Sequence, residues 1–217
     1  MIYPRRGSSF SLSLKFTPPY SLFRKENYWL LSSAEKLQIG DKMASTYAGL
    51  GDEAIQGYID DEISSRENEQ KFKFIEYHKW TFKGAWYTKL VSEFVLMAKA
   101  EFGYLGFYNR DIGTSPFEKF DVGGSGMMSY NLYGTDIVAL RGYSDGSLTP
   151  KATETQGSGI SYDNGNVYSK YTLELRYLFS PNPSATIYGL VFLEGGNAWS
   201  DIEKFNQALP PSRNTRP

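Results

Sequence analysis

The chain contains no cysteine and a single histidine, His78. Without cysteine it can form neither a disulfide nor a thiolate metal site. With one histidine it cannot assemble a cluster of histidine metal ligands or a multi-histidine catalytic centre. These absences exclude disulfide scaffolds, thiolate metal centres and histidine clusters.

The chain also lacks a charge excess and a long apolar run. Its 23 Lys and Arg residues face 24 Asp and Glu residues, so the basic surplus of a nucleic-acid-binding protein is missing. No apolar run approaches the roughly 20 residues of a membrane helix, and no signal peptide is expected in the segment Met1–Gly7. A mean hydropathy of −0.44 is compatible with a soluble protein and with a membrane β-barrel.

Aromatic residues and glycine are abundant. The chain holds 17 Tyr, 14 Phe and 21 Gly, which favours β structure with tight turns. The segment Ser9–Phe16 alternates Phe or Leu with Ser or Lys, the pattern of a strand with one apolar face. Within the first of the strands named next, a slip at Ile75–Glu76 predicts a bulge or a position at the rim. Alternation predicts four further strands: Lys71–Trp86, Val91–Tyr104, Lys170–Phe179 and Ala185–Phe192.

Long polar segments separate some of these strands. The stretch from Ile39 to Gln70 is acidic and is predicted to be a long exposed loop that can include a helical turn. Strands of about 9–16 residues, joined alternately by short turns and long loops, are typical of outer-membrane barrels. A soluble β-sandwich or lipid-binding barrel remains the alternative, although sandwich strands are usually nearer 5–6 residues.

Two apolar runs each carry one charge. Arg141 lies in Val138–Tyr143, and Glu194 lies in Phe192–Trp199. Burying either charge unpaired is costly, and the flat guanidinium fork of arginine suits a carboxylate. The pair therefore predicts a loop locked onto a strand. The alternative is an ordinary exposed arginine in a turn.

Four motifs in order give the chain a resemblance to a known family. Tyr3–Ser8 resembles a Pro-x-x-Gly strand entry, and Phe120–Gly124 resembles an aromatic–Gly-Gly stretch. Leu140–Tyr143 matches a Val-Arg-Gly-Phe/Tyr motif with Leu for Val, and Phe192–Trp199 matches Phe-x-Asp-x-Gly with Glu for Asp. Together they resemble the barrel of the BamA family of outer-membrane assembly factors, in the form found in Bacteroidota.

The resemblance implies an all-β fold and a location in the bacterial outer membrane. In that family a barrel of sixteen strands follows periplasmic POTRA domains. Residues 1–217 would form a partial C-terminal β-barrel domain, an antiparallel transmembrane portion holding about strands nine to thirteen. Its long extracellular loops would include the segment of about 39–70 and an inward-folding loop of about 107–169. The chain is then expected to be a fragment of a longer protein.

The resemblance also implies a structural site. Arg141, with Gly142 and Tyr143, would fold into the barrel and bond to the inward acids Glu194 and Glu174. Gly142, Gly195 and Gly196 would allow close approach of loop and wall, or else be simple turn glycines. Tyr143 would pack on the lumen wall or lie on the surface. His78 is expected to be an aromatic residue at the rim. Interface girdles, or else a soluble core, would be formed by five aromatics: Trp80, Trp86, Tyr87, Phe102 and Tyr104.

The implied function is non-enzymatic insertion of β-barrel proteins into the outer membrane, without cofactor, metal or nucleotide. Expected partners are outer-membrane lipid, nascent β-barrel clients and accessory proteins of an assembly complex, lipoproteins among them, but no nucleic acid. One alternative is a translocation pore of the same superfamily that secretes a passenger protein. A surface β-barrel of other function is another. A barrel enzyme such as a lipase is disfavoured, because no Ser-His-Asp set can be argued around His78 in a strand.

Overall fold

The computed structural model describes residues 3–24, 27–126, 134–150, 165–182 and 185–208. The chain forms two compact units. One contains Met1–Phe16, His78–Gly106 and Pro116–Pro217, and the other contains Thr17–Tyr77 and Phe107–Ser115. Each unit is described by itself below.

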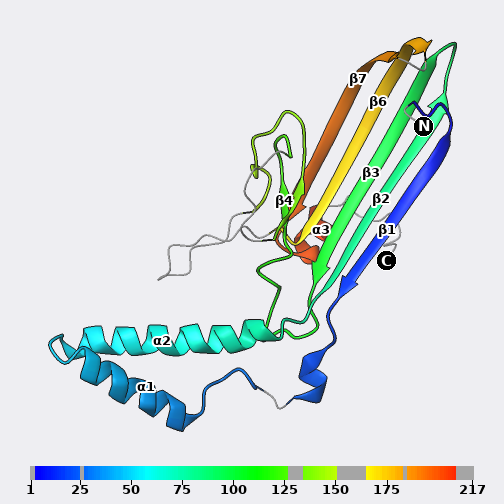
Figure 1. The fold of residues 1–217 in the computed structure, drawn as a ribbon. Helices are drawn as coiled ribbons and strands as arrows, with labels where there is room; N and C mark the ends of the chain where they lie inside the picture. The colour runs from blue at the N-terminus through cyan, green and yellow to red at the C-terminus, as the bar shows by residue number, and fades with distance from the viewer. Residues whose placement is uncertain (1–2, 25–26, 127–133, 151–164, 183–184, 209–217) are drawn as a thin grey trace, which may run out of the picture. The chain divides into compact units, whose positions relative to one another are not determined.

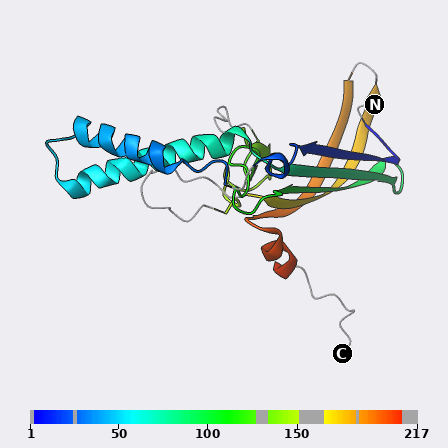
Figure 2. The same cartoon turned by 90° about the horizontal axis from the view of Figure 1, so that it is seen from below.

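The first unit is built on a five-stranded antiparallel sheet in the order β1-β2-β3-β6-β7 (Figure 1). Neighbouring strands are long and pair in continuous register, with one irregularity between Leu178 and Ser180. The strand direction turns steadily from β1 to β7, as expected of a twisted sheet (Figure 2). The strands are β1 (Gly7–Phe16), β2 (His78–Lys89), β3 (Phe94–Gly106), β6 (Val167–Asn182) and β7 (Ala185–Trp199).

Short and long connections alternate between the strands. β2 and β3 are joined through Leu90–Glu93, and β6 ends at Asn182 just before β7 begins at Ala185. The connections from β1 to β2 and from β3 to β6 are long and leave from the opposite end of the sheet. The predicted alternation of short turns and long loops is confirmed.

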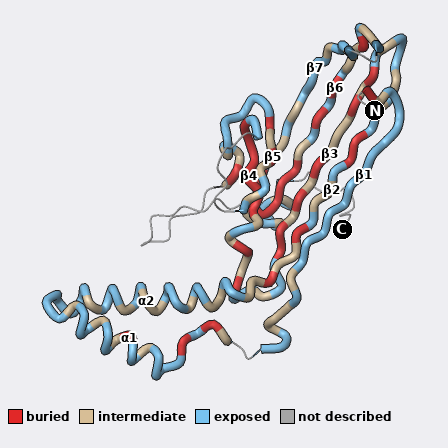
Figure 3. Tube along the Cα trace, viewed as in Figure 1, coloured by how far each residue is buried: buried red, intermediate tan, exposed pale blue. Residues whose placement is uncertain are grey.

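The exposure of the two faces of the sheet is the reverse of that in a soluble protein, because the apolar face is exposed and the polar face is buried. The apolar face carries Leu12, Trp86, Ala98, Leu173 and Leu193 on successive strands, and its large side chains are exposed, Leu12 by 67% and Leu193 by 73%. Buried and exposed positions alternate along the central strands (Figure 3). The opposite, polar face is buried at positions with charged or hydroxyl side chains: Lys79, Glu101, Thr172 and Glu174.

A two-stranded parallel sheet, β4 (Phe120–Val122) with β5 (Asp136–Val138), lies in the long connection between β3 and β6. Phe120 and Val122 are fully buried, and the Phe120 ring packs edge-on against Tyr168 of β6 at 4.7 Å between centroids. Because Tyr168 belongs to the polar face, this loop sheet covers that face. The predicted inward loop of about 107–169 includes this structure, and its residues 127–133 and 151–164 lie outside the described part.

The prediction of a long loop over 39–70 is wrong. The structure has two helices there, α1 (Ser33–Thr46) and α2 (Asp52–Lys73). Ser32 and Glu35 form a capping box at the start of α1. The spacing of four between Ile55, Ile59 and Ile63 gives α2 one apolar stripe. No helix of the described residues is long and apolar enough to cross a membrane.

The predicted strand from Lys71 begins too early. α2 continues to Lys73 and β2 begins only at His78, so the slip at Ile75–Glu76 marks a helix-to-strand junction and no bulge. The carboxylate of Glu76, fully buried, accepts hydrogen bonds from the backbone N–H and the hydroxyl of Ser21. The two ends of the connection between β1 and β2 are joined by a hydrogen bond, in which the Thr17 N–H donates to the Tyr77 carbonyl at 3.0 Å.

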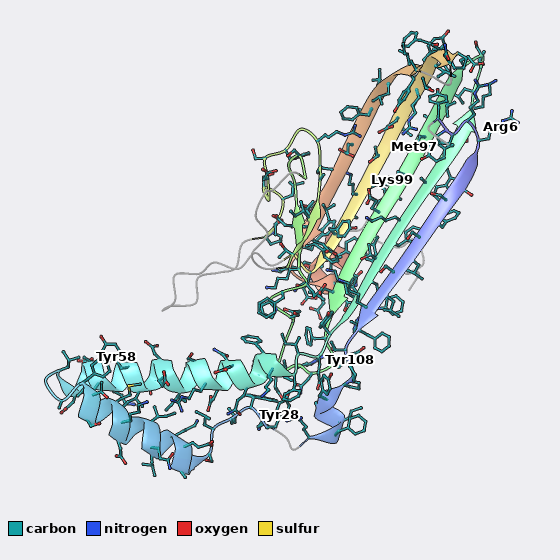
Figure 4. All side chains as sticks on the ribbon, viewed as in Figure 1. Arg6, Tyr28, Tyr58, Met97, Lys99 and Tyr108 are labelled. Carbon is teal, nitrogen blue, oxygen red and sulfur yellow. The ribbon has the colours of Figure 1, made fainter. Side chains whose placement is uncertain are left out.

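Few contacts join the two helices. Lys36 pairs with Glu67 at 2.8 Å, and the hydrogen bond from Lys36 lowers the pKa of Glu67 below its usual value. Tyr47 stacks on Tyr58, which Figure 4 labels near the α1–α2 connection, with 4.6 Å between ring centroids. Ile39 is the buried apolar residue of α1. The stability of α1 therefore depends more than usual on its capping box.

We predict that Ser32→Ala loosens α1 selectively. Loss of an N-cap costs about 0.5–2 kcal/mol, so amide hydrogens of Ser33–Thr46 should exchange about two- to thirtyfold faster. Hydrogen-exchange mass spectrometry of the intact protein measures this rate. Ser33→Ala, one residue into the helix, is the matched control and should leave exchange nearly unchanged. Equal exchange in both variants would contradict the capping role.

Candidate functional site

Arg141 is held in place by its two neighbours. On one side Leu140 is fully buried and donates its N–H to the Gly124 carbonyl at 3.0 Å. On the other side Gly142 has a φ of 89°, a conformation that residues with a Cβ rarely adopt. The chain therefore turns sharply just after a fixed point, and Arg141 projects onto β6 and β7.

Arg141 contacts both predicted carboxylates. Its backbone N–H donates to Glu194 Oε2 at 2.9 Å and its Nε donates to the same oxygen at 3.1 Å. A terminal guanidinium nitrogen lies 3.1 Å from Glu174 Oε1. The structure thus brings together the loop residue and the two strand residues that the sequence singled out.

The carboxylates are much more buried than the arginine. The side chain of Glu194 is 3% exposed, whereas that of Arg141 is 42% exposed. Buried carboxylates require cations and hydrogen-bond donors. Glu194 also pairs with Lys170 at 3.0 Å and accepts a hydrogen bond from the Thr172 hydroxyl at 2.9 Å. Glu174 pairs in addition with Arg176 at 2.6 Å, so that three cations contact the two carboxylates.

An aromatic ring completes the arginine site. The guanidinium carbon of Arg141 lies 3.6 Å from the centre of the Phe192 ring, a cation–π contact. The hydrogen bond to Glu194 raises the pKa of Arg141 above its usual value, so the guanidinium stays charged. Lys170 donates to the Ala139 carbonyl at 2.5 Å, which ties the loop backbone to β6 a second time. We call Arg141, Glu174, Glu194, Lys170 and Phe192 the loop lock.

A second anchor lies on β2. Lys79, whose side chain is only 2% exposed, pairs with Glu118 at 3.0 Å and with Asp136 at 2.8 Å. Its ammonium nitrogen also lies 4.7 Å from the centre of the Phe120 ring. All three partners belong to the loop between β3 and β6. This second anchor therefore holds the loop sheet to the opposite side of the same face.

The charge of Glu118 is kept at neutral pH. Burial alone would raise the pKa of Glu118, but the hydrogen bonds and charges of Lys79 and Lys15 together outweigh burial and lower it. A carboxyl group whose pKa is lowered on folding adds stability above its unfolded pKa and loses it as pH falls through the folded value. The second anchor is thus intact at neutral pH and weakens only in acid.

The predicted glycines behave differently from one another. A Cβ at Gly196 would lie 2.6 Å from the Ser169 carbonyl oxygen, so close approach to β6 requires glycine there. A Cβ at Gly142 or Gly195 would meet no heavy atom within 4 Å among the described residues, so close approach does not explain these two glycines. Tyr143 is 45% exposed, which agrees with the surface alternative.

The expected aromatic girdle is largely on the apolar face. Trp80, Trp86, Phe102 and Tyr104 all lie at positions of that face, and Trp80 donates to His78 Nδ1 at 3.1 Å. Tyr87 is the exception, since it lies on the polar face and packs against the cluster of Tyr3, Val95 and Leu178.

The sequence singled out the arginine and its acids but missed the other cations. Lys170 and Arg176 share the polar parity of Glu174 on one strand, so alternation alone could have identified them. Lys79 also has polar parity, but its partners Glu118 and Asp136 lie outside any repeating pattern. Within the described residues no group of three or more His, Cys, Asp or Glu side chains is placed to hold a metal ion.

We predict that Lys79→Met loosens the loop sheet. The substitution leaves Glu118 without its buried cation, and we expect a cost of about 1–3 kcal/mol because Glu118 and Asp136 are partly exposed. Limited chymotrypsin digestion of the intact protein should then cut faster within residues 107–150. Lys83→Met is the control, because Lys83 is 53% exposed and 3.8 Å from Glu101. Equal cleavage rates in the two variants would count against this anchor.

Comparison with known proteins agrees with this architecture. The model of the Omp85 superfamily domain matches residues 2–215. The outer membrane protein assembly factor BamA of Neisseria meningitidis serogroup B (strain ATCC BAA-335 / MC58) is 31% identical over 129 residues. The aligned part covers 58% of this chain but only 14% of that relative, so the chain corresponds to a small part of the relative's length.

These matches explain the inverted sheet. In an outer-membrane barrel the apolar face contacts lipid and the polar face lines the interior. The sheet is therefore an antiparallel portion of a transmembrane β-barrel, located in the bacterial outer membrane. The exposed apolar side chains and the buried charges both follow from that setting. Since the family model covers nearly the whole chain, the chain belongs to the Omp85 superfamily.

Proposed function

We propose that the chain forms part of the barrel wall of an outer-membrane insertase, which folds and inserts β-barrel proteins. The observation that carries this proposal is the loop lock, in which Arg141 of an interior loop binds the wall residues Glu174 and Glu194. Its support from relatives is the match to a protein named an outer membrane protein assembly factor. In the complete barrel these strands would be about strands nine to thirteen.

The lock would act by fixing the interior loop, without taking part in chemistry. Two anchors on opposite sides of the polar face, Lys79 and Arg141, hold the loop sheet against the wall. A wall fixed in this way keeps its strands in register while another part of the barrel opens to pair with an incoming strand. Such pairing is β-augmentation, which needs backbone hydrogen bonds and no cofactor.

The partners follow from the same proposal. Outer-membrane lipid would contact the apolar face, and nascent β-barrel proteins would be the clients. Accessory proteins of an assembly complex, lipoproteins among them, would bind elsewhere on the complete protein. A translocation pore of the same superfamily is the rival proposal, and what favours assembly is the name of the matched relative.

We predict that Arg141→Ala in the full-length protein impairs assembly. The variant leaves two buried carboxylates short of a cation, at a cost of about 1–3 kcal/mol. Cells that rely on it should contain less folded outer-membrane β-barrel protein, as measured by heat-modifiable electrophoretic mobility. Arg141→Lys should be intermediate, because an ammonium cannot reproduce the guanidinium fork.

The matched control is Arg6→Ala, which removes an exposed arginine just before β1 (Figure 4). It should leave client levels unchanged. Normal client levels with Arg141→Ala, at normal abundance of the variant itself, would contradict the role of the lock. Loss of one secreted passenger with unchanged barrel clients would favour the translocation pore.

A further inference from the structure

The apolar face is not smooth. A groove of about 480 Å³ includes Ala98 and Ala100 of β3 in its lining. Trp86 of β2 and Leu173 of β6 pair with Ala98 on its two sides. Ala100 pairs with Tyr171 of β6 on one side and with Gly84 of β2 on the other. The two alanines therefore form the floor of the groove, beside the larger side chains of Trp86, Tyr171 and Leu173.

Larger residues stand on β3 at either end of the alanine pair. Along the apolar face of β3 the alanines are preceded by Leu96 and followed by Phe102. Phe102 is in turn covered by Phe205 of α3 (Ile202–Ala208), with 5.5 Å between ring centroids, and Phe205 also packs on Trp199 at 4.9 Å. The small side chains are therefore confined to the middle of β3.

The lining is apolar although charged residues adjoin it in sequence. Lys99 and Glu194 border the groove through their strands, but their side chains are engaged elsewhere. Lys99 pairs with Glu101 at 2.6 Å, and Glu194 belongs to the loop lock. Figure 4 labels Lys99 and Met97, two polar-face positions of β3. The ligand that this surface favours is therefore a hydrocarbon.

The groove extends over four neighbouring strands. Its lining includes Trp86 of β2, the two alanines of β3, Tyr171 and Leu173 of β6, and Leu193 of β7. A single hydrocarbon chain fits such a furrow, and the volume lies within the roughly 300–1,000 Å³ of small-molecule sites.

We propose that this groove binds one acyl chain of an outer-membrane lipid. The groove is continuous with the lipid-contacting face, so its occupant comes from the bilayer. A bound chain replaces contacts that a bulkier residue would make at Ala98 and Ala100, and this favours its retention over lipid around the smooth parts of the wall. The proposal does not depend on the insertase function, only on the membrane location.

Native mass spectrometry tests the proposal on the full-length protein, delipidated in detergent and titrated with dipalmitoyl-phosphatidylethanolamine. The double variant Ala98→Phe, Ala100→Phe fills the groove. We expect it to lose one tightly retained lipid per protein relative to wild type. The control double variant Leu12→Phe, Leu14→Phe adds bulk to the same face on β1, outside the groove, and should retain that lipid. Equal retention in all three proteins, or retention of a polypeptide in place of lipid, would overturn the proposal.

A second measurement uses only the wild-type protein, so it tests the proposal even if the groove-filling variant fails to fold. The wild-type protein is loaded with phosphatidylethanolamine that carries a photoreactive diazirine on its acyl chain, washed with detergent and irradiated. Cross-links should concentrate in peptides that contain Trp86, Ala98–Ala100 and Tyr171–Leu173. An even spread that includes Leu12 and Leu14 of β1, on the same face, would exclude a specific site.

Discussion

The structure depends on the cost of burying Glu174 and Glu194. The two carboxylates lie diagonally on neighbouring strands of one face, where they lose water and repel each other, so they need cations nearby. Lys170 and Arg176 come from the same strand as Glu174, but the third cation, Arg141, must be delivered by a loop. The position of that loop, and of the loop sheet that carries it, follows from this electrostatic demand.

The two faces of the sheet are stabilised by different interactions. The polar face is stabilised by ion pairs and hydrogen bonds, whereas a soluble core is stabilised by apolar packing. Lys79 and Arg141 bind the loop to this face. On the apolar face, large side chains remain exposed because the membrane solvates them. A variation in side-chain size there, as at Ala98 and Ala100, shapes a surface for lipid without disturbing the charges behind it.

Alternation in the sequence predicted most of the sheet, because a period of two can be read directly from residues such as Phe10, Leu12 and Leu14. Arg141 and Glu194 could also be identified from the sequence, since each is a single charge that interrupts an apolar run. The helical hairpin was missed because acidic residues surround the stripe of Ile55, Ile59 and Ile63. Pairings such as Lys79 with Asp136 join a strand to an irregular loop, and no local pattern encodes them.

The hydrogen bond between Thr17 and Tyr77 has a consequence for how this barrel can change over time. The connection from β1 to β2 begins and ends at neighbouring residues, because Phe16, the last residue of β1, pairs with His78, the first residue of β2. The entropy of closing a loop rises only slowly with its length. Whole helices can therefore be gained or lost between Phe16 and His78 during evolution while β1 and β2 keep their pairing, which makes this connection a place for lineage-specific structure.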